Sequence, residues 1–319
     1  MGGNDRTKDM MDTLNFPKVT EIAVPLFIAA ILIELLWIVI KGRGGRYETR
    51  DAVTSLIMGA GNVASGILLG FVAYGFFMLL WRITPLDLGT SAWVILLCFV
   101  LDDLRYYWVH RFGHRIRWVW ASHVNHHSSQ HYNLTTALRQ TWTGTFTFMM
   151  VVRAPLILLG FHPAMVLFVG GLNLVYQFWI HTEAIGRMPR WFEAVMNTPS
   201  HHRVHHGRNA RYLDANYAGV FIIWDKIFGT FVPEQDREKV DYGLVRNIGT
   251  FNPIRVAFHE WVGIFKDVTQ PGLTWRERWM YCVAPPGWSH DGSRDTSETI
   301  KRKHLERHPE DRGTPGFEA

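Results

Sequence analysis

The strongest pattern in the chain is a pair of long apolar runs near its start. Residues 22–40 form a run of 19 residues whose only charge is Glu34, and residues 52–81 follow with 30 uncharged residues. A helix rises about 1.5 Å per residue, so each run is long enough to cross a hydrocarbon layer of about 30 Å. Gly66 and Gly70 have the spacing that lets membrane helices pack closely. The pattern predicts two membrane helices, and a cleaved signal peptide is the weaker alternative for the first.

Two later apolar segments are shorter or interrupted. Residues 88–101 are uncharged but too short to span a bilayer alone, so we expect this helix to continue to about residue 118 and to leave the membrane. Residues 141–182 are apolar except for Arg153, and the glycine and proline within 160–163 mark a turn near the middle. This segment is predicted to form a membrane hairpin, which returns the chain to the side it left whether it crosses fully or re-enters.

Basic residues in the short loops indicate the orientation. The loop 41–51 carries four basic residues against two acidic ones, whereas the turn 83–90 carries only Asp87. Because basic loops stay on the cytoplasmic side, the first loop is expected in the cytoplasm and the second outside. Counting onward through the helix and the hairpin places residues 110–131 and 181–206 on the same cytoplasmic face. The sequence thus predicts an integral multi-pass membrane protein with its polar chemistry in the cytoplasm.

The predicted fold class is all-α, a helical membrane bundle of about four to five membrane segments with a cytoplasmic, histidine-rich cap. Beyond residue 207 the chain is mostly polar and charged and has no second long apolar run. We expect four regions along the chain: an N-terminal tail at 1–20, membrane helices at 21–109, a catalytic region at 110–233 that includes the membrane hairpin 141–182, and a cytoplasmic C-terminal extension at 234–319.

Composition narrows the chemistry. The 319 residues contain 33 Lys and Arg against 28 Asp and Glu, and we interpret the net charge of +5 chiefly as an orientation signal. No nucleic-acid partner is expected. Two cysteines exclude a disulfide framework, a four-thiolate zinc site and an iron–sulfur cluster. The unusual number is 16 histidines, of which 12 lie within the 97 residues from 110 to 206. Any metal chemistry must therefore use ligands other than cysteine.

The histidines form three clusters and one isolated position. Spacings of three and four residues recur in the clusters, and on a helix such spacings place imidazoles on one face. The motif His-x-x-His-His occurs twice, which packing and solvated histidines do not explain. Among the others, His131 and His201 stay open and the rest are interpreted as ordinary solvated side chains. The nine candidate metal ligands are His110, His114, His123, His126, His127, His181, His202, His205 and His206.

Nine histidines exceed the capacity of one ion. A catalytic zinc uses three protein ligands and a structural zinc four, so two ions are implied. Imidazole suits zinc, copper, iron and nickel, and ligand type alone does not choose among them. About four or five imidazoles per ion leave an open position at six-coordinate iron, where dioxygen can bind. The glutamate-rich pattern of soluble di-iron bundles and the His-Glu-x-x-His motif of zinc proteases do not occur in the sequence.

Two carboxylates are candidates for orienting the imidazoles. Asp103 precedes His110 by seven residues, nearly two helical turns, and so lies on the same face of the predicted helix. Glu183 follows His181 by two residues. Acidic side chains close to an apolar run are costly unless they have a function. We therefore expect Asp103 and Glu183 to accept hydrogen bonds from the outer N–H groups of ligand imidazoles.

Around these histidines the sequence resembles the fatty acid hydroxylase and sterol desaturase superfamily. Residues 126–140, 197–209 and 216–230 are similar to its alkylglycerol monooxygenase branch, and the resemblance extends over residues 102–231. The family's three histidine boxes fall on the three clusters, and His181 matches the histidine that precedes the third box. The resemblance implies a membrane-bound oxygenase with two iron ions, dioxygen as co-substrate, and electrons from an external donor protein or other reductant.

The functional hypothesis is a lipid hydroxylase or desaturase that acts on an ether lipid, a fatty acyl chain or a sterol. Such a substrate would enter from the bilayer with its head group at the interface. A histidine-rich membrane transporter or binding protein for metal, and a dinuclear zinc lipid hydrolase, are the alternatives. Clusters that follow apolar runs instead of interrupting them favour catalysis over transport. The side chains expected to support the lipid pocket are Tyr132, Asn133, Arg139, Asn209 and Tyr217.

Overall fold

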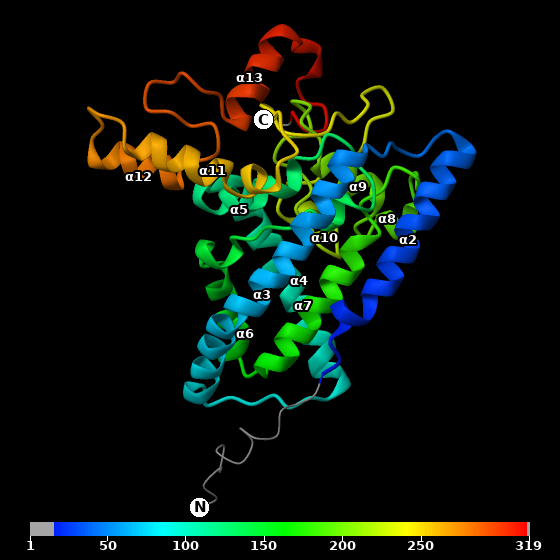
Figure 1. Cartoon of the computed structure of the whole chain (residues 1–319), viewed down its shortest axis with the longest axis vertical. Helices are drawn as coiled ribbons and strands as arrows, with labels where there is room; N and C mark the ends of the chain where they lie inside the picture. The colour runs from blue at the N-terminus through cyan, green and yellow to red at the C-terminus, as the bar shows by residue number, and fades with distance from the viewer. Residues whose placement is uncertain (1–15, 318–319) are drawn as a thin grey trace, which may run out of the picture.

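A computed structural model describes residues 16–317 of the chain (Figure 1). Within that range the protein consists of helices and loops without a β-strand, and its sheet-like contacts are two isolated bridges, Met196 with Phe221 and Gly207 with Tyr242. The all-α class predicted from the sequence is confirmed. Most of the predicted tail at 1–20 lies outside the described residues.

Four helices run along the long axis of the molecule (Figure 1). They are α2 (Val19–Lys41), α3 (Thr49–Ile83), α4 (Ala92–Arg115) and α7 (Pro163–Phe178). The first two coincide with the apolar runs, and both are long and apolar enough to cross a membrane. Only 11% and 6% of their most apolar stretches are buried within the protein, which distinguishes them from the core helices of a soluble fold.

The turn between α2 and α3 is set by glycines and a cap. Gly42 ends α2 in the left-handed conformation, with φ 63°, which glycine adopts without strain. Glu48 then caps α3, because its side chain accepts a hydrogen bond of 2.6 Å from the backbone N–H of Asp51. Between them, Gly45 also has a positive φ and packs against the Tyr132 carbonyl and the Glu183 side chain. The loop therefore lies directly against the histidine-rich region.

The helix predicted to run to about residue 118 ends at Arg115 instead. Ile116 has an extended backbone, with φ −123° and ψ 114°, and α5 (Arg117–His127) then packs back against α4. The carbonyl of Ala284 accepts a hydrogen bond of 3.1 Å from the N–H of Arg117. A distant part of the chain thus fixes the break, and the break turns the histidines of α5 toward those of α4.

The predicted hairpin 141–182 has an irregular first limb and a helical second limb, α7. Phe148 takes a left-handed φ of 58°, and the ring of Pro155 excludes a helical hydrogen bond to the residue four positions earlier. Apolar composition therefore does not yield one continuous helix in the first limb. Its pieces are η2 (Gly144–Thr147), η3 (Met149–Arg153) and α6 (Ala154–Leu158).

Residues 116–139 and 179–317 form a cap at one end of the long helices (Figure 1). The predicted C-terminal extension within it is not uniformly polar, because α11 and α12 expose apolar side chains. Those side chains are spaced along helices and form no continuous run that would mark them in the sequence. Besides α5, the cap contains η1 (Thr136–Leu138), α8 (Arg190–Glu193), α9 (Pro199–His205), α10 (Ile223–Ile227), α11 (Pro253–Val268), α12 (Trp275–Val283), α13 (Ser297–Arg307) and η4 (Pro309–Asp311).

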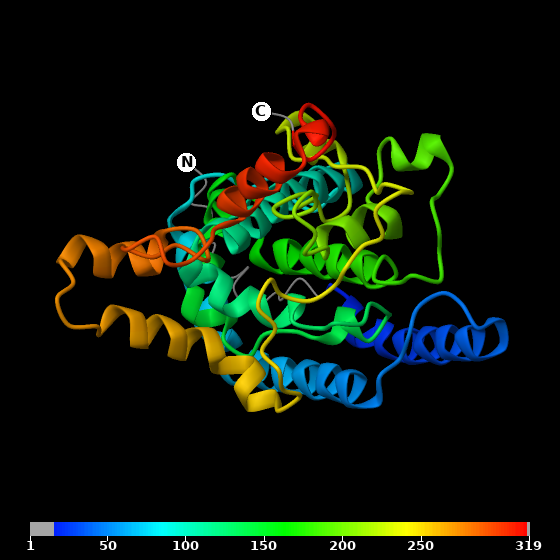
Figure 2. The same cartoon turned by 90° about the horizontal axis from the view of Figure 1, so that it is seen from above.

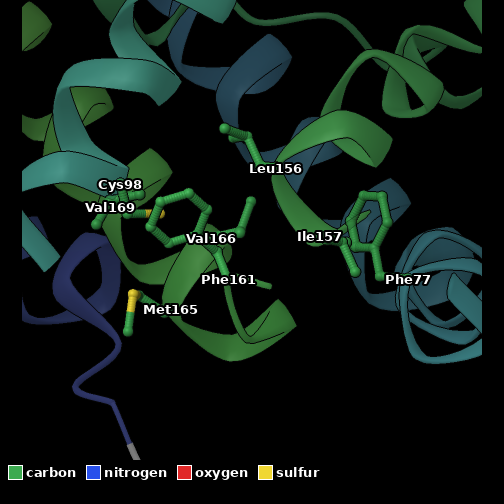
Figure 3. Close-up of a cluster of buried hydrophobic side chains, with 8 residues drawn as sticks. All are labelled: Phe77, Cys98, Leu156, Ile157, Phe161, Met165, Val166 and Val169. Carbon is green, nitrogen blue, oxygen red and sulfur yellow. The ribbon is translucent and has the colours of Figure 1, made fainter. Parts of the chain in front are cut away.

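A buried apolar cluster joins the long helices at the end opposite the cap (Figure 3). α3 contributes Phe77, α4 contributes Cys98, and the side chains of α6, the following turn and α7 complete the cluster. Because all these residues are at most 5% exposed, their burial is a main source of stability for this end. The members from the hairpin are Leu156, Ile157, Phe161, Met165, Val166 and Val169.

A buried ion pair joins the cap to α3. The guanidinium of Arg139 donates to Asp51 Oδ1 at 3.0 Å, to the Asn125 carbonyl at 3.2 Å and to Ser128 Oγ at 2.9 Å. Both charged side chains are at most 4% exposed. The charge of Arg139, which was predicted from the sequence to lie at the lipid pocket, is thus matched by the acidic residue in the first turn of α3.

We expect Arg139→Ala to lower the free energy of unfolding by about 3–5 kcal/mol, because it leaves the buried Asp51 carboxylate unpaired. The matched control is Arg208→Ala, which removes a more exposed ion pair with Asp241 and is expected to cost less than about 1 kcal/mol. Thermal unfolding of both variants in detergent measures the difference. Equal melting temperatures for the two variants would show that the buried pair does not hold the cap.

Candidate metal centre

Nine imidazoles meet in the interior where α4, α5 and α9 converge with the end of α7. They form two groups, and within each group the ligand nitrogen atoms all lie within 4.8 Å of one another. All nine histidines predicted from their spacing are therefore brought together, and the seven other histidines lie outside both groups. The first group contains His110, His114, His123, His127 and His205, and the second contains His126, His181, His202 and His206.

The repeated motif His-x-x-His-His explains how one pair of helices builds two groups. Its first and last histidines, four residues apart, stay within one group, as His123 and His127 do. The histidine between them turns to the other group, because adjacent residues on a helix point about 100° apart. His126 thereby leaves the group of its own motif, and His205 does the same in the second copy. Each helix supplies ligands to both groups.

Backbone carbonyls fix the protonation of three rings. Nδ1 of His110 lies 2.7 Å from the Tyr217 carbonyl, Nδ1 of His181 lies 2.7 Å from the Gln177 carbonyl, and Nδ1 of His205 lies 2.9 Å from the Ala215 carbonyl. A carbonyl oxygen only accepts hydrogen bonds, so each Nδ1 must carry the proton. Nε2 of each ring is then left with a bare lone pair, which is the form of imidazole that binds metal.

Each of these Nε2 atoms points at the Nε2 of a neighbouring ring. Nε2 of His181 lies 3.1 Å from Nε2 of His126 and 2.9 Å from Nε2 of His202 in the second group. In the first group, Nε2 of His123 lies 3.0 Å from Nε2 of His110 and 3.1 Å from that of His127. Buried Nε2 atoms of His114 and His206 have no hydrogen-bond partner. Leaving a buried nitrogen without a partner is costly, and a cation bound within each group would give these nitrogens one.

The spacing of the nitrogens fits one metal ion in each group. Ligand nitrogens about 2.1 Å from an ion lie about 3.0 Å apart when their bonds are at right angles, and about 3.4 Å apart in a tetrahedron. Five Nε2 pairs are 2.9–3.1 Å apart, and all the ligand atoms of a group lie within 4.8 Å of one another. Each group can therefore surround one ion.

The groups are neutral near pH 7. Burial lowers the pKa of His202, His205 and His206 well below the usual range, and the neighbouring imidazoles lower it further. Neither group includes a carboxylate among its ligand atoms. Bound ions would therefore keep their full positive charge in a buried space, which favours the binding of anionic or reducible small molecules.

A family match covers this centre. Residues 95–230 match the family model described as Fatty acid hydroxylase, and this stretch includes all nine histidines. The matched residues form a fatty acid hydroxylase domain. It begins within α4 and ends just beyond α10.

Curated relatives agree with this assignment. The chain is 42% identical to alkylglycerol monooxygenase of Homo sapiens over 280 residues, which are 85% of this chain and 60% of the relative. It is 43% identical to alkylglycerol monooxygenase of Danio rerio over 244 residues, 76% of this chain and 54% of the relative. An ornithine lipid hydroxylase of Rhizobium tropici is 25% identical over 162 residues, 51% of this chain and 49% of the relative. The chain thus spans only somewhat more than half of the alkylglycerol monooxygenases, and no solved structure gives a significant match.

Asp103 binds backbone N–H groups of the hydroxylase domain and does not, as predicted, orient an imidazole. Its carboxylate accepts hydrogen bonds from the N–H groups of Val220 and Phe221, at 2.8 and 2.9 Å, and touches no imidazole. Trp224 Nε1 and Asn173 Nδ2 also donate to it. Seven residues along a helix separate Asp103 from His110 by about 10 Å, which is too far for a hydrogen bond even on one face. The carboxylate instead anchors the loop whose carbonyl holds His110.

Glu183 does not orient an imidazole either. Its carboxylate accepts a hydrogen bond of 3.2 Å from the Tyr242 hydroxyl, and the Gln177 carbonyl takes the position at His181 that Glu183 was predicted to occupy. The chain turns after His181, so the side chain two residues later points away from the ring.

Two aspartates that sequence reasoning missed support the hydroxylase domain. Asp225 accepts hydrogen bonds from the N–H groups of Tyr217 and Ala218, at 2.7 and 2.8 Å, and so fixes the carbonyl that faces His110. Asp214 lies 3.8 Å from Nδ1 of His114 and also binds Arg115. Neither aspartate stands at a helical spacing from a histidine cluster, and backbone carbonyls carry no sequence signal at all.

Two of the five predicted pocket residues adjoin the imidazoles. The ring of Tyr132 lies 5.1 Å from that of His206, and the ring of Tyr217 lies 5.3 Å from that of His114. The others hold backbone instead of lining the centre. Asn133 donates to the Arg46 carbonyl, Asn209 bonds to the Lys239 carbonyl and the Asp241 N–H, and Arg139 binds Asp51.

We expect the purified protein to hold two metal ions per chain, and single substitutions to remove them separately. His202→Ala should lower the content to about one ion through the second group, and His123→Ala should do so through the first. The control His308→Ala changes a half-exposed histidine outside both groups and should keep both ions. Elemental analysis after removal of loosely bound metal is the measurement. Unchanged metal content in both ligand variants would contradict the assignment.

Acid should destabilise the metal-free protein. The folded pKa of His202, His205 and His206 is below that of the unfolded chain, about 6.5, so the unfolded chain binds more protons as pH falls through that value. Each such histidine then favours unfolding by up to about 1.4 kcal/mol per pH unit. The melting temperature of the metal-free protein should therefore fall as the pH is lowered from about 7.5 to about 5.5, and the fall should be smaller in His202→Gln. An identical pH dependence in the variant would refute this cause.

Proposed function

We propose that the chain is a membrane-bound di-iron oxygenase that hydroxylates, or desaturates, a lipid at an unactivated C–H bond. The observation that carries the proposal is the pair of buried, neutral imidazole groups, each able to surround one ion, inside a fatty acid hydroxylase domain. Relatives named alkylglycerol monooxygenase, ornithine lipid hydroxylase and cholesterol 25-hydroxylase support a lipid substrate. An ether lipid, a fatty acyl chain and a sterol are the candidate substrates.

The proposal includes an integral, multi-pass position in the membrane. The exposed apolar faces of α2 and α3 are the surfaces that lipid would cover, and α4 and the hairpin would complete the bundle. The loop after α2 is rich in basic residues, which supports a cytoplasmic location for it and for the cap that it touches. A lipid held with its head group at the interface would then reach the imidazoles from the bilayer side.

Bound iron ions would supply the activation of dioxygen and the oxidation of the C–H bond, using electrons from an external protein or reductant. The residues of the chain hold and shield that chemistry. Buried imidazoles exclude water, and the carbonyls of Tyr217, Gln177 and Ala215 keep three rings in the metal-binding form. The buried rings of Tyr132 and Tyr217 pack against the groups.

The geometry also bears on the two alternatives. A transporter binds metal along a path within its membrane helices, whereas these groups form a closed site at the cap end of the bundle. A dinuclear zinc hydrolase would favour a carboxylate or water-activating base among its ligands, and neither group includes a carboxylate. Catalysis by iron is therefore the better supported function.

The decisive experiment combines metal exchange with isotope-labelled dioxygen. Protein reconstituted in lipid nanodiscs and loaded anaerobically with iron should, after addition of a reductant and labelled dioxygen, give a lipid product that is either hydroxylated with labelled oxygen or desaturated. Protein loaded with zinc should give none. His126→Ala should be inactive because it removes a ligand of the second group, whereas Arg208→Ala should remain active. Lipid cleavage without dioxygen, by the zinc-loaded protein, would replace the oxygenase proposal with hydrolysis.

A further inference from the structure

The helix α11 has one broad apolar side, part of which is packed and part exposed. It packs into the protein through Val256, Ala257 and Ile264, which are at most 4% exposed. The exposed part carries a stripe in which residues follow at intervals of four, four and three, which keeps them on one side of a helix. Its members are exposed by 62%, 39%, 48% and 68%, and they are Ile254, Phe258, Val262 and Phe265. Within the described residues, nothing covers this stripe.

The next helix continues the exposed apolar surface with two tryptophans. Trp275 and Trp279, four residues apart on α12, are 87% and 65% exposed. Thr274 and Glu277 form a capping box at the start of α12, so the tryptophans stand on a well-ordered helix and not on a frayed end. Exposed tryptophan on one helix face is typical of segments that sit at the boundary between lipid head groups and acyl chains.

Both helices cross the direction of the long helices. Figures 1 and 2 show α11 and α12 extending sideways from the cap, on the side away from α2. α11 packs against the cap-side half of α3, where the Phe251 carbonyl accepts from Thr54 Oγ1 and Val256 packs on Met58. If α3 spans the membrane, α11 and α12 lie near the membrane surface and roughly in its plane.

The exposed stripe adjoins α3 at Phe258. Trp142 donates to the Met58 carbonyl and packs directly on Gly61, and its ring lies 6.4 Å from that of Phe258. Gly61 is about 10 Å further from the cap than Thr54, at about 1.5 Å per residue. Phe258 therefore lies beside a part of α3 that is well inside its apolar run.

The surface is continuous with other exposed apolar side chains and has basic flanks. Trp261 packs on Trp118, whose Nε1 donates to the Phe146 carbonyl, and the exposed side chains of Phe146 and Phe148 follow there. Beside the stripe and the tryptophans are the exposed basic residues Arg255, Lys266 and Arg276. An apolar face with basic residues at its border is complementary to a bilayer that contains anionic head groups.

We propose that α11 and α12 form an interfacial anchor that rests in the head-group region of the bilayer crossed by α2 and α3, with the stripe and the two tryptophans inserted among the upper acyl chains. This inference rests on the proposed membrane position of the protein. The anchor is proposed to bind lipid and not a second protein, because the stripe adjoins the apolar run of α3 and has exposed tryptophans and basic side chains beside it.

The anchor is rigidly connected to the metal centre. Arg117, the first residue of α5, donates to Glu260 at 2.6 Å and pairs with Asp267 at 2.7 Å, and both acids belong to α11. The opposite end of α5 carries three of the nine histidines. Insertion of the anchor thus sets the depth of the metal centre relative to the lipid, and with it the part of a lipid chain that reaches the ions.

Site-specific fluorescence quenching tests the anchor in the full chain. Cys98→Ala and Cys282→Ser remove the native thiols, and single cysteines at Phe265→Cys, Ile67→Cys and His308→Cys then carry an environment-sensitive dye. Ile67 is 77% exposed on α3 and reports the membrane span, whereas half-exposed His308 lies beyond α13 and reports solvent. Each labelled protein is placed in nanodiscs of phosphatidylcholine and phosphatidylglycerol and exposed separately to spin-labelled lipid and to aqueous iodide.

The dye at position 265 should be quenched several-fold more by a lipid carrying its spin label near the head group than by iodide, and the dye at 308 should show the reverse. Quenching at 265 by iodide alone, with lipid quenching retained at 67, would overturn the anchor and leave the membrane span and the oxygenase intact. Protection at 265 from both quenchers would overturn it in favour of a protein partner. Iodide quenching at 67 as well would contradict the membrane position itself. The oxygen-labelling experiment tests catalysis separately, because it measures the lipid product and not the location of a helix.

Discussion

The metal centre depends on one electrostatic constraint: nine neutral imidazoles are packed in a buried space with ligand nitrogens that a cation would satisfy. Three of the rings have their protons fixed on Nδ1 by backbone carbonyls, so their Nε2 atoms can only accept a hydrogen bond or bind a cation. Charging the rings is also unfavourable, because burial lowers the pKa of His202, His205 and His206. The protein maintains this arrangement only by anchoring the surrounding loops, and Asp103 and Asp225 do so through backbone N–H groups.

The same constraint links the two ends of the molecule. α4 begins in the apolar cluster and ends in the metal centre, so burial at one end positions ligands at the other. Glu34 gives a second connection from within the first apolar run, because its carboxylate accepts hydrogen bonds from the Leu134 N–H and from the hydroxyls of Tyr47 and Thr182. Thr182 directly follows His181. The one charged residue of residues 22–40 is thus a contact between α2 and the cap and not an interruption of the helix.

Local patterns were predictable from the sequence, whereas contacts between distant segments were not. Continuous apolar runs predicted α2 and α3 closely, and the histidine spacings predicted the nine residues that converge, because both signals are local and periodic. The imidazole partners predicted for Asp103 and Glu183 were wrong, because the partner of a carboxylate depends on which loop folds over the helix. The break at Ile116 and the irregular first limb of the hairpin depend on tertiary contacts and on Phe148 and Pro155. The exposed apolar residues of α11 and α12 were not predicted, because they alternate with charged residues along the sequence and form no continuous apolar run.

X-ray absorption at the iron edge tests the central claim most directly, because it reports the atoms around each ion independently of activity. Iron-loaded protein should contain two ions per chain, each with a shell of nitrogen ligands at about 2.1 Å and the outer-shell scattering of several imidazole rings. A four-coordinate tetrahedral shell, sulfur scattering, or a shell dominated by carboxylate oxygen would contradict the account.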